Sequence, residues 1–285
     1  MRPVGQLRPG DHAWLAFGGG EERERIVGTF VTDGLATEEK VVYVTDTDPA
    51  NLPGVRWPTG ADPQDFVRSG QLRVLSREAA CLTGGRFDPE RMLDVLDEEV
   101  SQAFDQGFRA VRITTDLSWA VREAAEPVLG CEHRFGAAVS PSTMAMAICQ
   151  LDRRRVPAGR LAALRDAHEV LVEVDPEFDD GVLRVVRTFD PHGLRVEGEL
   201  DAARHMVFAE RLSLAARGRR RVHLDCSRLR FLDLAGLNLL VAQAARLPHG
   251  GLLVLDRLPA EVAGVIETVG WHRLPGLARG RDGAR

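Results

Sequence analysis

Lysine is almost absent from this chain of 285 residues. Lys40 is the only lysine among 37 basic residues, so arginine supplies nearly all of the positive charge. A phosphate-binding loop of the P-loop class needs a lysine directly after its glycines, where it reaches the β- and γ-phosphates of a nucleotide. Lys40 instead follows two glutamates and precedes an apolar run. The sequence therefore argues against a P-loop nucleotide hydrolase.

Long apolar runs and paired cysteines are also missing. No stretch of about 18 apolar residues that could cross a membrane occurs, and the first residues have no segment of the signal-peptide type. The four cysteines form no C-x-x-C pair, which is typical of reduced thiols rather than of disulfides or a zinc knuckle. We therefore expect a cytoplasmic protein that makes no membrane contact.

The charge balance and the motif content exclude further classes. A net charge of −5 and a pI near 5.9 argue against nucleic-acid binding, which usually needs a basic stripe. No spacing typical of a Ser-His-Asp hydrolase or a metal-dependent hydrolase is present, so we do not expect an enzyme. With 44% apolar and 28% charged residues, the chain has the composition and length of about two globular domains.

The first part of the chain alternates predicted strands and helices. Asp88 followed by Pro89 is a helix start signal, because Asp caps a helix and Pro suits its first position. This alternation predicts an α/β fold, a doubly wound parallel sheet with ligands at the carboxyl ends of its strands. We expect strands at 12–17, 41–45, 72–75, 110–114, 144–151 and 170–174, and helices at 21–36, from 89 onward, at 124–135 and at 161–168.

The second part predicts a smaller α/β domain. The segment 175–181 is short, acidic and contains Pro and Gly, so we expect a linker there. Trp271 and Leu274 are expected to pack back on the domain, and residues 278–285 to form a disordered tail. The predicted strands are 182–189, 194–198, 222–225 and 252–255, and the predicted helices 202–216, 237–246 and 259–269.

The stretch from Val222 to Leu237 reads as a strand, a tight loop and an exposed helix start. Asp233 can cap that helix, and Gly236 permits a close backbone approach. Together with Gly198-Glu199-Leu200-Asp201, this stretch resembles STAS domains, the fold of anti-sigma factor antagonists, over residues 181–277. The resemblance implies a protein-interaction module whose partner is an anti-sigma factor similar to a serine kinase, and hence a role in regulating transcription.

One residue departs from that family. STAS regulators carry a phosphorylated serine two residues after the aspartate, and here that position is Ala235. Alanine has no hydroxyl, so it can neither accept a phosphoryl group nor be switched by one. The resemblance implies that the partner-binding residues are Asp233, Leu234, Ala235, Gly236 and Asn238.

The first part also resembles a family, the MEDS sensory domain, whose fold is similar to RecA and KaiC ATPases. The resemblance covers residues 8–174, and the family usually has an aromatic residue where Leu151 stands. It implies sensing of a small molecule whose identity is unknown, and it names no cofactor. The residues that carry it are Asp11-His12, Phe87-Asp88-Pro89, Gly107-Phe108, Asp116-Leu117-Ser118-Trp119-Ala120, Glu132 and Cys149-Gln150-Leu151-Asp152.

A first group of candidate ligand-binding residues follows the predicted strands. We expect a pocket at the carboxyl ends of the strands, bordered by Phe17, Gly18, Asp46, Asp116 and Trp119. The glycines that begin with Gly18 could cradle an anion, although a flexible turn is the favoured interpretation. Trp119 could stack on a planar ligand or cover the edge of the core.

A second group consists of His12, Glu132 and Cys149. These side chains are of types that ligate metals or haem, and they could converge in the fold. A lone histidine and a buried cysteine are more often packing residues, so no metal is assigned from the sequence.

The resulting hypothesis is a cytoplasmic signalling protein that joins a sensory domain to an interaction module. One alternative is a degenerate RecA-like nucleotide-binding enzyme. Another is a structural adaptor whose first domain binds no ligand. The sequence leaves open whether the protein forms a homodimer.

Overall fold

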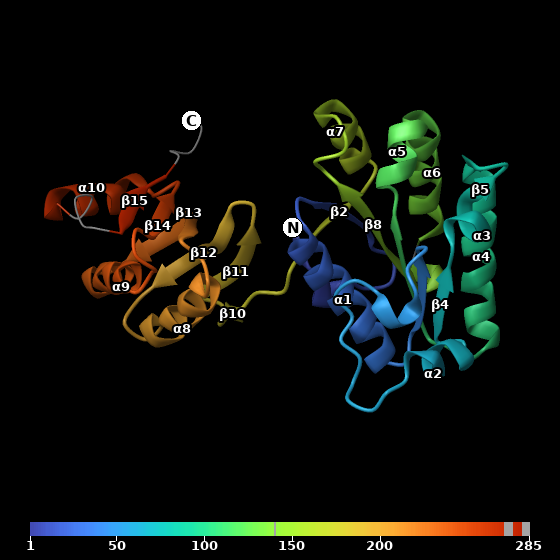
Figure 1. The fold of residues 1–285 in the computed structure, drawn as a ribbon, viewed down its shortest axis with the longest axis horizontal. Helices are drawn as coiled ribbons and strands as arrows, with labels where there is room; N and C mark the ends of the chain where they lie inside the picture. The colour runs from blue at the N-terminus through green and yellow to red at the C-terminus, as the bar shows by residue number, and fades with distance from the viewer. Residues whose placement is uncertain (140, 271–275, 281–285) are drawn as a thin grey trace. The chain divides into compact units, whose positions relative to one another are not determined.

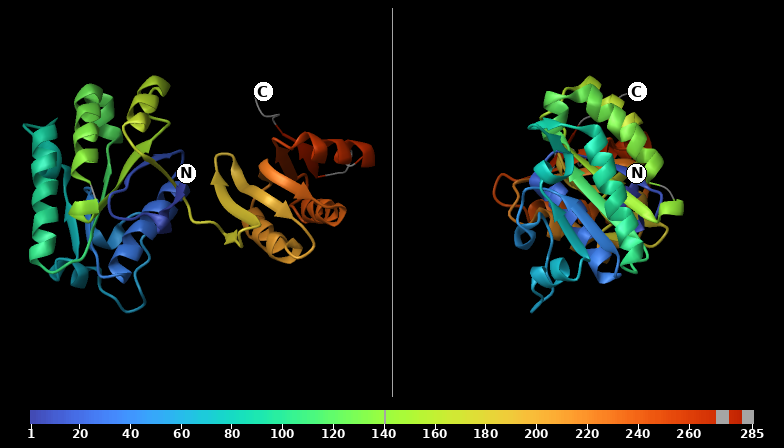
Figure 2. Two further views of the ribbon diagram at one scale, coloured as in Figure 1. Left: turned by 180° about the vertical axis from the view of Figure 1, so that it is seen from behind. Right: turned by 90° about the vertical axis from the view of Figure 1, so that its right-hand side faces the viewer.

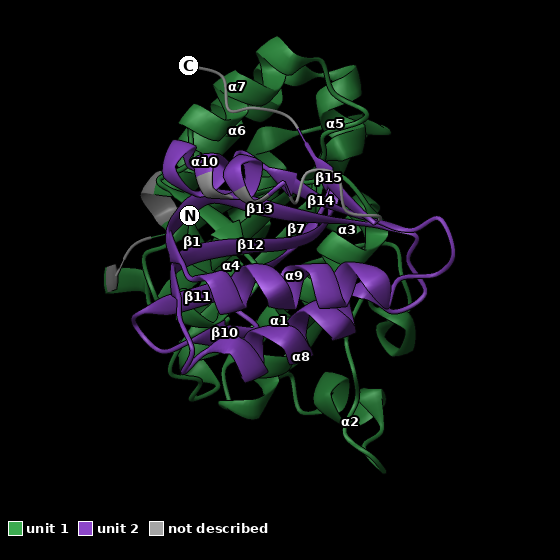
Figure 3. Ribbon diagram, turned by 90° about the vertical axis from the view of Figure 1, so that its left-hand side faces the viewer, with its two compact units in different colours: residues 1–174 green, residues 175–285 purple. Residues whose placement is uncertain are grey.

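The structure is a computed structural model that describes residues 1–139, 141–270 and 276–280 (Figure 1). The chain divides into two compact units, Met1–Val174 and Asp175–Arg285, which Figure 3 colours separately. We call them unit 1 and unit 2 and describe each by itself.

Unit 1 is built on a seven-stranded sheet in the order β1-β9-β2-β8-β7-β3-β4. Every pairing in this sheet is parallel. This arrangement confirms the doubly wound α/β fold predicted from the alternating pattern. The strands are β1 (Arg2–Pro3), β2 (His12–Phe17), β3 (Lys40–Val44), β4 (Leu72–Leu75), β7 (Val111–Asp116), β8 (Ala145–Asp152) and β9 (Val170–Glu173).

Helices cover both faces of this sheet, with α1 and α4 on opposite sides (Figures 1 and 2). The Asp88 side chain accepts hydrogen bonds from the N–H groups of Glu90 and Arg91, so the predicted cap of α4 is confirmed. A hairpin, β5 (Leu82–Thr83) and β6 (Arg86–Phe87), precedes α4. The helices are α1 (Gly20–Ala36), α2 (Pro63–Arg68), α3 (Arg77–Cys81), α4 (Pro89–Asp105), α5 (Ser118–Glu123), α6 (Ala125–Ala138) and α7 (Ala158–Asp166), with short 3-10 turns at Val4–Gln6, Pro49–Asn51 and Pro141–Thr143.

The central strands are buried on both faces, as a parallel sheet between helices requires. Every residue of β3 and of β8 is buried. Val42 and Val44 of β3 share one core cluster with Met92 and Leu96 of α4. Lys40, at the start of β3, is buried as well, with its Nζ 2.9 Å from the Glu99 carboxylate. The only lysine is therefore held in an ion pair inside unit 1.

Unit 2 has a six-stranded sheet in the order β10-β11-β12-β13-β14-β15. The first two pairings are antiparallel and the rest are parallel. Its own core joins Phe208 and Leu212 of α8 to the strands. The elements are β10 (Phe178–Asp179), β11 (Leu183–Phe189), β12 (His192–Leu200), α8 (His205–Ala216), β13 (Arg221–Leu232), α9 (Leu234–Ala245), β14 (Leu252–Asp256), α10 (Ala260–Val269) and β15 (Leu277–Arg279).

Two segments of unit 2 differ from the prediction. Residues 226–232, expected as a loop, continue β13, because Arg228–Leu232 pair in parallel with Glu197–Leu200 of β12. The expected linker 175–181 contains strand β10, in which Phe178 pairs with Val185. Both strands depend on pairing with a distant segment, and a local pattern does not show such pairing.

The predicted disordered tail is also partly wrong. Ala278 and Arg279 belong to β15, which pairs with β14. Residues 281–285 and the residues expected to pack back, Trp271 and Leu274, lie outside the described residues.

Two further findings concern the helices and the cysteines. Within the described ranges, no helix has both the length and the apolar character needed to cross a membrane. All four cysteines are free thiols and buried.

Candidate functional site

Four ionisable side chains meet inside unit 1, and we call them the buried polar cluster: His12, Glu132, Cys149 and His168. His12 begins β2 and Cys149 lies on the adjacent strand β8, while Glu132 comes from α6 and His168 from the segment between α7 and β9. One ligand atom from each lies within 4.8 Å of the others. All four residues are buried.

The Glu132 Oε2 atom is the hub of the cluster. It lies 3.0 Å from His12 Nε2, 3.2 Å from Cys149 Sγ and 3.2 Å from His168 Nε2. His12 Nε2 is also 3.3 Å from Cys149 Sγ. On its other side, His168 Nδ1 lies 2.7 Å from the Leu164 carbonyl oxygen. A single oxygen thus faces three potential ligand or hydrogen-bond groups.

Burial and mutual contact set the charges in the cluster. Burial would raise the pKa of Glu132, but the neighbouring His12 and His168 side chains outweigh it and lower that pKa to about 2. Burial lowers the pKa of His12. Burial, reinforced by the Glu132 charge, raises the pKa of the Cys149 thiol well above its usual value. The protein alone therefore holds a carboxylate beside a neutral thiol.

The structure brings together the three residues that the sequence proposed as converging. His12, Glu132 and Cys149 contact one another directly. His168, which belongs to a helix–strand connection, was not predicted from the sequence. Its position follows from the strand order, since β9 lies next to β2. The available signal was a histidine at the end of a predicted helix, two residues before a predicted strand.

A separate hollow of about 220 Å³ lies at the carboxyl ends of the strands. Arg77 pairs with Asp46, and its guanidinium lies over the Trp119 ring, 5.3 Å from the centroid. Arg23 lies 3.4 Å from the Asp116 carboxylate. Hydrogen bonds from the Arg77 backbone and side chain lower the pKa of Asp46. The hollow is lined by Arg23, Val44, Thr45, Asp46, Thr47, Arg77, Asp116 and Trp119, so three of the predicted ligand residues share it.

Phe17 and Gly18 are not among the residues that line this hollow. The Phe17 ring is covered by the guanidinium of Arg23, 5.4 Å from the centroid. The Gly18 N–H donates to the Glu22 carboxylate at 2.7 Å, and that carboxylate also pairs with Arg153. An acidic side chain of the protein thus occupies the place where the glycine loop would hold an anion.

In unit 2 the predicted partner-binding residues surround the start of α9. The Asp233 carboxylate caps the helix by accepting from the Gly236 N–H at 2.6 Å, as predicted, and it also lies 3.0 Å from His205 Nε2. Leu234, Ala235 and Asn238 are exposed, while Gly236 is buried. A Cβ at Gly236 would lie 2.5 Å from a Leu232 methyl carbon. The loop therefore presents an uncharged first turn to the surface.

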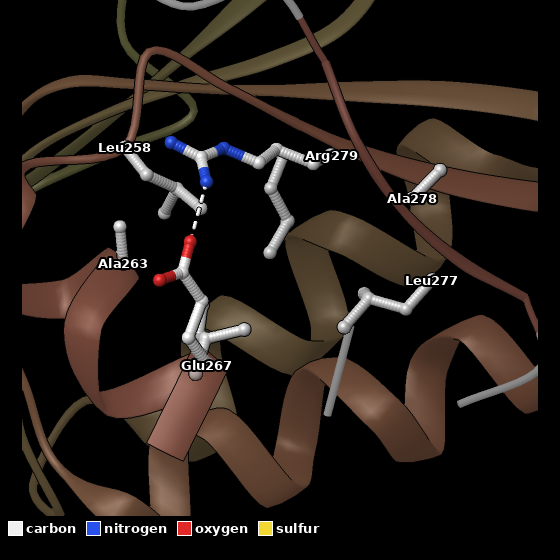
Figure 4. A pocket seen from close by; sticks show the side chains of 8 residues that line it. Leu258, Ala263, Glu267, Leu277, Ala278 and Arg279 are labelled. Atoms are coloured by element: carbon white, nitrogen blue, oxygen red, sulfur yellow. Dashed lines mark hydrogen bonds and ion pairs between the residues drawn. The ribbon is translucent and has the colours of Figure 1, made fainter. Parts of the chain in front are cut away.

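Unit 2 also has an apolar hollow of about 400 Å³ between α10 and β15. Glu267 of α10 and Arg279 of β15 point toward each other across it and form an ion pair at 2.6 Å (Figure 4). Leu255, Leu258 and Ile266 supply much of its lining. None of the residues predicted from the sequence lies there.

Comparisons with known proteins match each unit to a family. Residues 11–169 match the family model described as MEDS, the MEthanogen/methylotroph, DcmR Sensory domain. Residues 183–277 match the model described as Mlab, STAS domain. No curated protein matches the chain.

Among solved structures, a KaiC-like protein, PH0186, from the hyperthermophilic archaeon Pyrococcus horikoshii OT3 aligns with a TM-score of 0.43 and 14% identity. The alignment covers 63% of this chain and 78% of that chain. So weak a likeness supports no inference about this chain. The MEDS match spans more than half of the sequence and the STAS match follows it in the predicted order. The chain therefore belongs to the MEDS family, with a STAS domain after its MEDS domain.

Proposed function

We propose that this chain is a cytoplasmic signalling protein in which unit 1 senses a small ligand and unit 2 binds an anti-sigma factor similar to a serine kinase, thereby regulating transcription. A sensory domain followed by a STAS domain supports a role in signalling. The proposal assigns partner binding to the first turn of α9. One observation carries this assignment: the turn is exposed and uncharged, and Ala235 stands where STAS regulators carry a phosphoacceptor serine.

The chemistry of that turn favours a protein partner. Leu234 is 56% exposed, and Phe231 at the end of β13 is 48% exposed. Met206, which follows the histidine that contacts Asp233, is 87% exposed. Large exposed apolar side chains gathered at one edge of a domain are typical of a protein-docking surface. We call Met206, Phe231, Leu234, Ala235 and Asn238 the α9 docking surface.

The docking surface is permanently competent to bind in this proposal. Phosphorylation of the usual serine would add about two negative charges and end binding through repulsion and desolvation. Ala235 cannot be modified in this way. The Asp233 carboxylate is occupied by the Gly236 N–H and by His205, so it adds little free negative charge to the turn. Regulation then comes from unit 1 or from the abundance of the protein.

The test introduces charge at the docking surface. Ala235→Asp should weaken binding of the anti-sigma partner by about tenfold or more, because a carboxylate would be buried against an apolar contact. Ala235→Ser should restore phosphorylation if the partner has kinase activity. Binding is measured by calorimetric titration of the full chain against the serine-kinase-like anti-sigma proteins of the same genome, with and without ATP.

Ala260→Asp is the matched control. Ala260 is also exposed, in the first turn of α10, so the same charge is added to another helix start of unit 2. A negative charge at a helix start is compatible with the helix dipole, and both variants should remain folded. If Ala235→Asp binds as tightly as the wild type and Ala260→Asp, the α9 docking surface is not the interface.

We further propose that unit 1 is not a nucleotide hydrolase. The Gly18 N–H is taken by Glu22, and Lys40 pairs with Glu99 at the start of β3, away from the glycine loop. No measurable turnover of ATP with magnesium is expected. Turnover that disappears in Asp116→Asn would contradict this proposal, since Asp116 lies at the carboxyl end of β7.

A further inference from the structure

The buried polar cluster contains more acceptors than its protons can satisfy. His168 Nδ1 must carry its proton to donate to the Leu164 carbonyl at 2.7 Å. In the neutral ring, Nε2 then has only a lone pair, and it faces Glu132 Oε2 at 3.2 Å. Within the described part of the chain, His168 Nε2 and Glu132 Oε1 have no hydrogen-bond partner. His168 Nε2 and Glu132 Oε2 are then two buried acceptors that face each other. Such a pair is unfavourable unless a cation lies between the two atoms.

The separations between the ligand atoms suit a small metal ion. Tetrahedral zinc, with bonds of about 2.0–2.3 Å, places its ligand atoms roughly 3.3–3.6 Å apart. Four of the separations in the cluster are 3.0, 3.3, 3.2 and 3.2 Å, and none exceeds 4.8 Å. To complete the coordination, the four short separations must lengthen by a few tenths of an ångström, and a separation near 4.8 Å must shorten by about 1 Å.

The charges of the four groups suit a divalent ion. When the ion binds, the Cys149 thiol releases its proton to solvent. Two neutral imidazoles, one carboxylate and one thiolate then carry two negative charges together, so a divalent cation makes the site neutral. A neutral complex is favoured here because all four side chains are buried. Nitrogen and sulfur ligands select zinc or a related transition metal rather than magnesium or calcium.

The surroundings of the cluster resemble the outer shell of a metal site. A metal-binding histidine commonly donates its second ring N–H to a carbonyl, which fixes the tautomer and orients the ring. The Leu164 carbonyl plays this part for His168. The His12 ring packs against the edge of Phe135, and the Trp14 ring lies 5.0 Å from that of His168. The site is closed and largely apolar around its ligands.

The geometry does not suit haem. The porphyrin nitrogens surround the iron in a plane at about 2 Å, and the side chains would have to bind above and below that plane. Glu132 and Cys149 lie within 3.3 Å of His12 Nε2 and of each other, so they fill the space that a porphyrin would need. A bare cation fits where the cofactor does not.

We propose that His12, Glu132, Cys149 and His168 bind one divalent transition-metal cation, with zinc the best match. With four protein ligands and no open position, the ion would hold β2, α6, β8 and the segment before β9 together rather than catalyse a reaction. This metal site does not depend on the proposed partner of unit 2.

The experiment uses the purified full-length chain after removal of metals by a chelator. Zinc is added in a calorimetric titration, and the bound metal is counted by elemental analysis. We expect about one zinc per chain and a rise in the melting temperature with zinc concentration. Cobalt, added in place of zinc, should give the absorption band of a thiolate bound to tetrahedral cobalt.

Matched variants test the ligands. Cys149→Ser and His168→Gln should each lower zinc affinity by at least about tenfold. Cys131→Ser and His133→Gln, which change a buried cysteine and an exposed histidine on either side of Glu132, should leave zinc affinity unchanged. The cobalt spectrum of the wild type needs no variant, so the test survives if a variant fails to fold.

Two outcomes would overturn the metal site. One is a wild-type chain that takes up neither zinc nor cobalt, with His168 found doubly protonated by NMR, so that a proton alone satisfies Glu132. The other is zinc affinity that falls equally in the ligand variants and in the two controls.

Discussion

The two units place their polar and apolar groups in opposite ways. Among the described residues, fourteen of the sixteen buried polar or charged side chains belong to unit 1, including His12, Glu132 and His168 of the buried polar cluster. Unit 2 buries two, Arg187 and Gln243. A buried polar group is costly unless it is paired or binds a ligand, so the buried polar groups of unit 1 need partners inside that unit.

Unit 2 places apolar side chains on its surface at one edge. Met206, Phe231 and Leu234 lie at the start of α8, the end of β13 and the start of α9. The contact between His205 and Asp233 links the starts of the two helices. In unit 1 the exposed apolar residues Phe104 and Leu171 are far apart: Phe104 lies on α4, which packs over β3, and Leu171 lies on β9, four strands away across the sheet. This contrast agrees with our two proposals, in which the interior of unit 1 binds a ligand and the surface of unit 2 recognises a protein.

The largest effect is expected from breaking a buried ion pair of unit 1. Lys40→Ala removes the ammonium group 2.9 Å from Glu99, whose side chain is 8% exposed. A buried carboxylate that loses its main partner costs about 3–5 kcal/mol in the free energy of unfolding. Arg73→Ala removes the other partner of Glu99, but the Arg73 side chain is 56% exposed, so the cost should stay below about 1 kcal/mol.

Urea unfolding followed by tryptophan fluorescence measures both variants. Trp14, Trp57 and Trp119 all belong to unit 1, so the signal reports mainly on that unit. If both variants lose the same free energy of unfolding, burial does not decide how much Lys40 contributes to stability. The contrast between buried and surface charge in unit 1 would then fail.

The next effect compares the same substitution in two helices. Gly28 of α1 is buried, and a Cβ there would lie 2.2 Å from the Gly54 carbonyl oxygen. Gly28→Ala should therefore destabilise unit 1 by about 1–3 kcal/mol, because backbone must move. Gly264 of α10 has open space around it, and Gly264→Ala should stabilise its helix by about 0.5–1 kcal/mol.

Amide hydrogen exchange of α1 and α10 tests this pair of variants, since it reports local stability in each unit. Slower exchange in α10 and faster exchange in α1 is the expected result. A stabilising effect of Gly28→Ala would show that α1 can move away from Gly54. Unit 1 would then be less tightly packed than its buried residues indicate.

Much of the fold could be predicted because local patterns determine it. The bounds of β2 and β4 were predicted residue for residue, since apolar runs there stop at turn residues. The end of β13 was missed for a physical reason. Arg228 and Arg230 are exposed, and the pairing with β12 has register shifts near Glu197 and Glu199 that disturb the two-residue alternation.

The sites could be predicted only in part. His12, Glu132 and Cys149 were grouped because their side chains share ligand chemistry, whereas His168 joins them only through the strand order β9-β2-β8. In the hollow at the carboxyl ends, the acidic residues follow strands and were predictable. Arg23 comes from a helix after the glycine loop, and its direction depends on side-chain packing that periodicity does not specify.

The smallest effect separates stability from recognition at two helix caps. Asp233→Ala and Asp88→Ala each remove a cap, of α9 and of α4, and each should cost about 1 kcal/mol of unfolding free energy. Only Asp233→Ala should also weaken partner binding, because it frees the first turn that carries Leu234 and Ala235. Asp233→Asn keeps a good cap and should restore both stability and binding, as measured by thermal unfolding and by calorimetric titration. If Asp233→Asn is stable but does not bind, the carboxylate itself contacts the partner, and recognition by unit 2 is more polar than its exposed apolar side chains suggest.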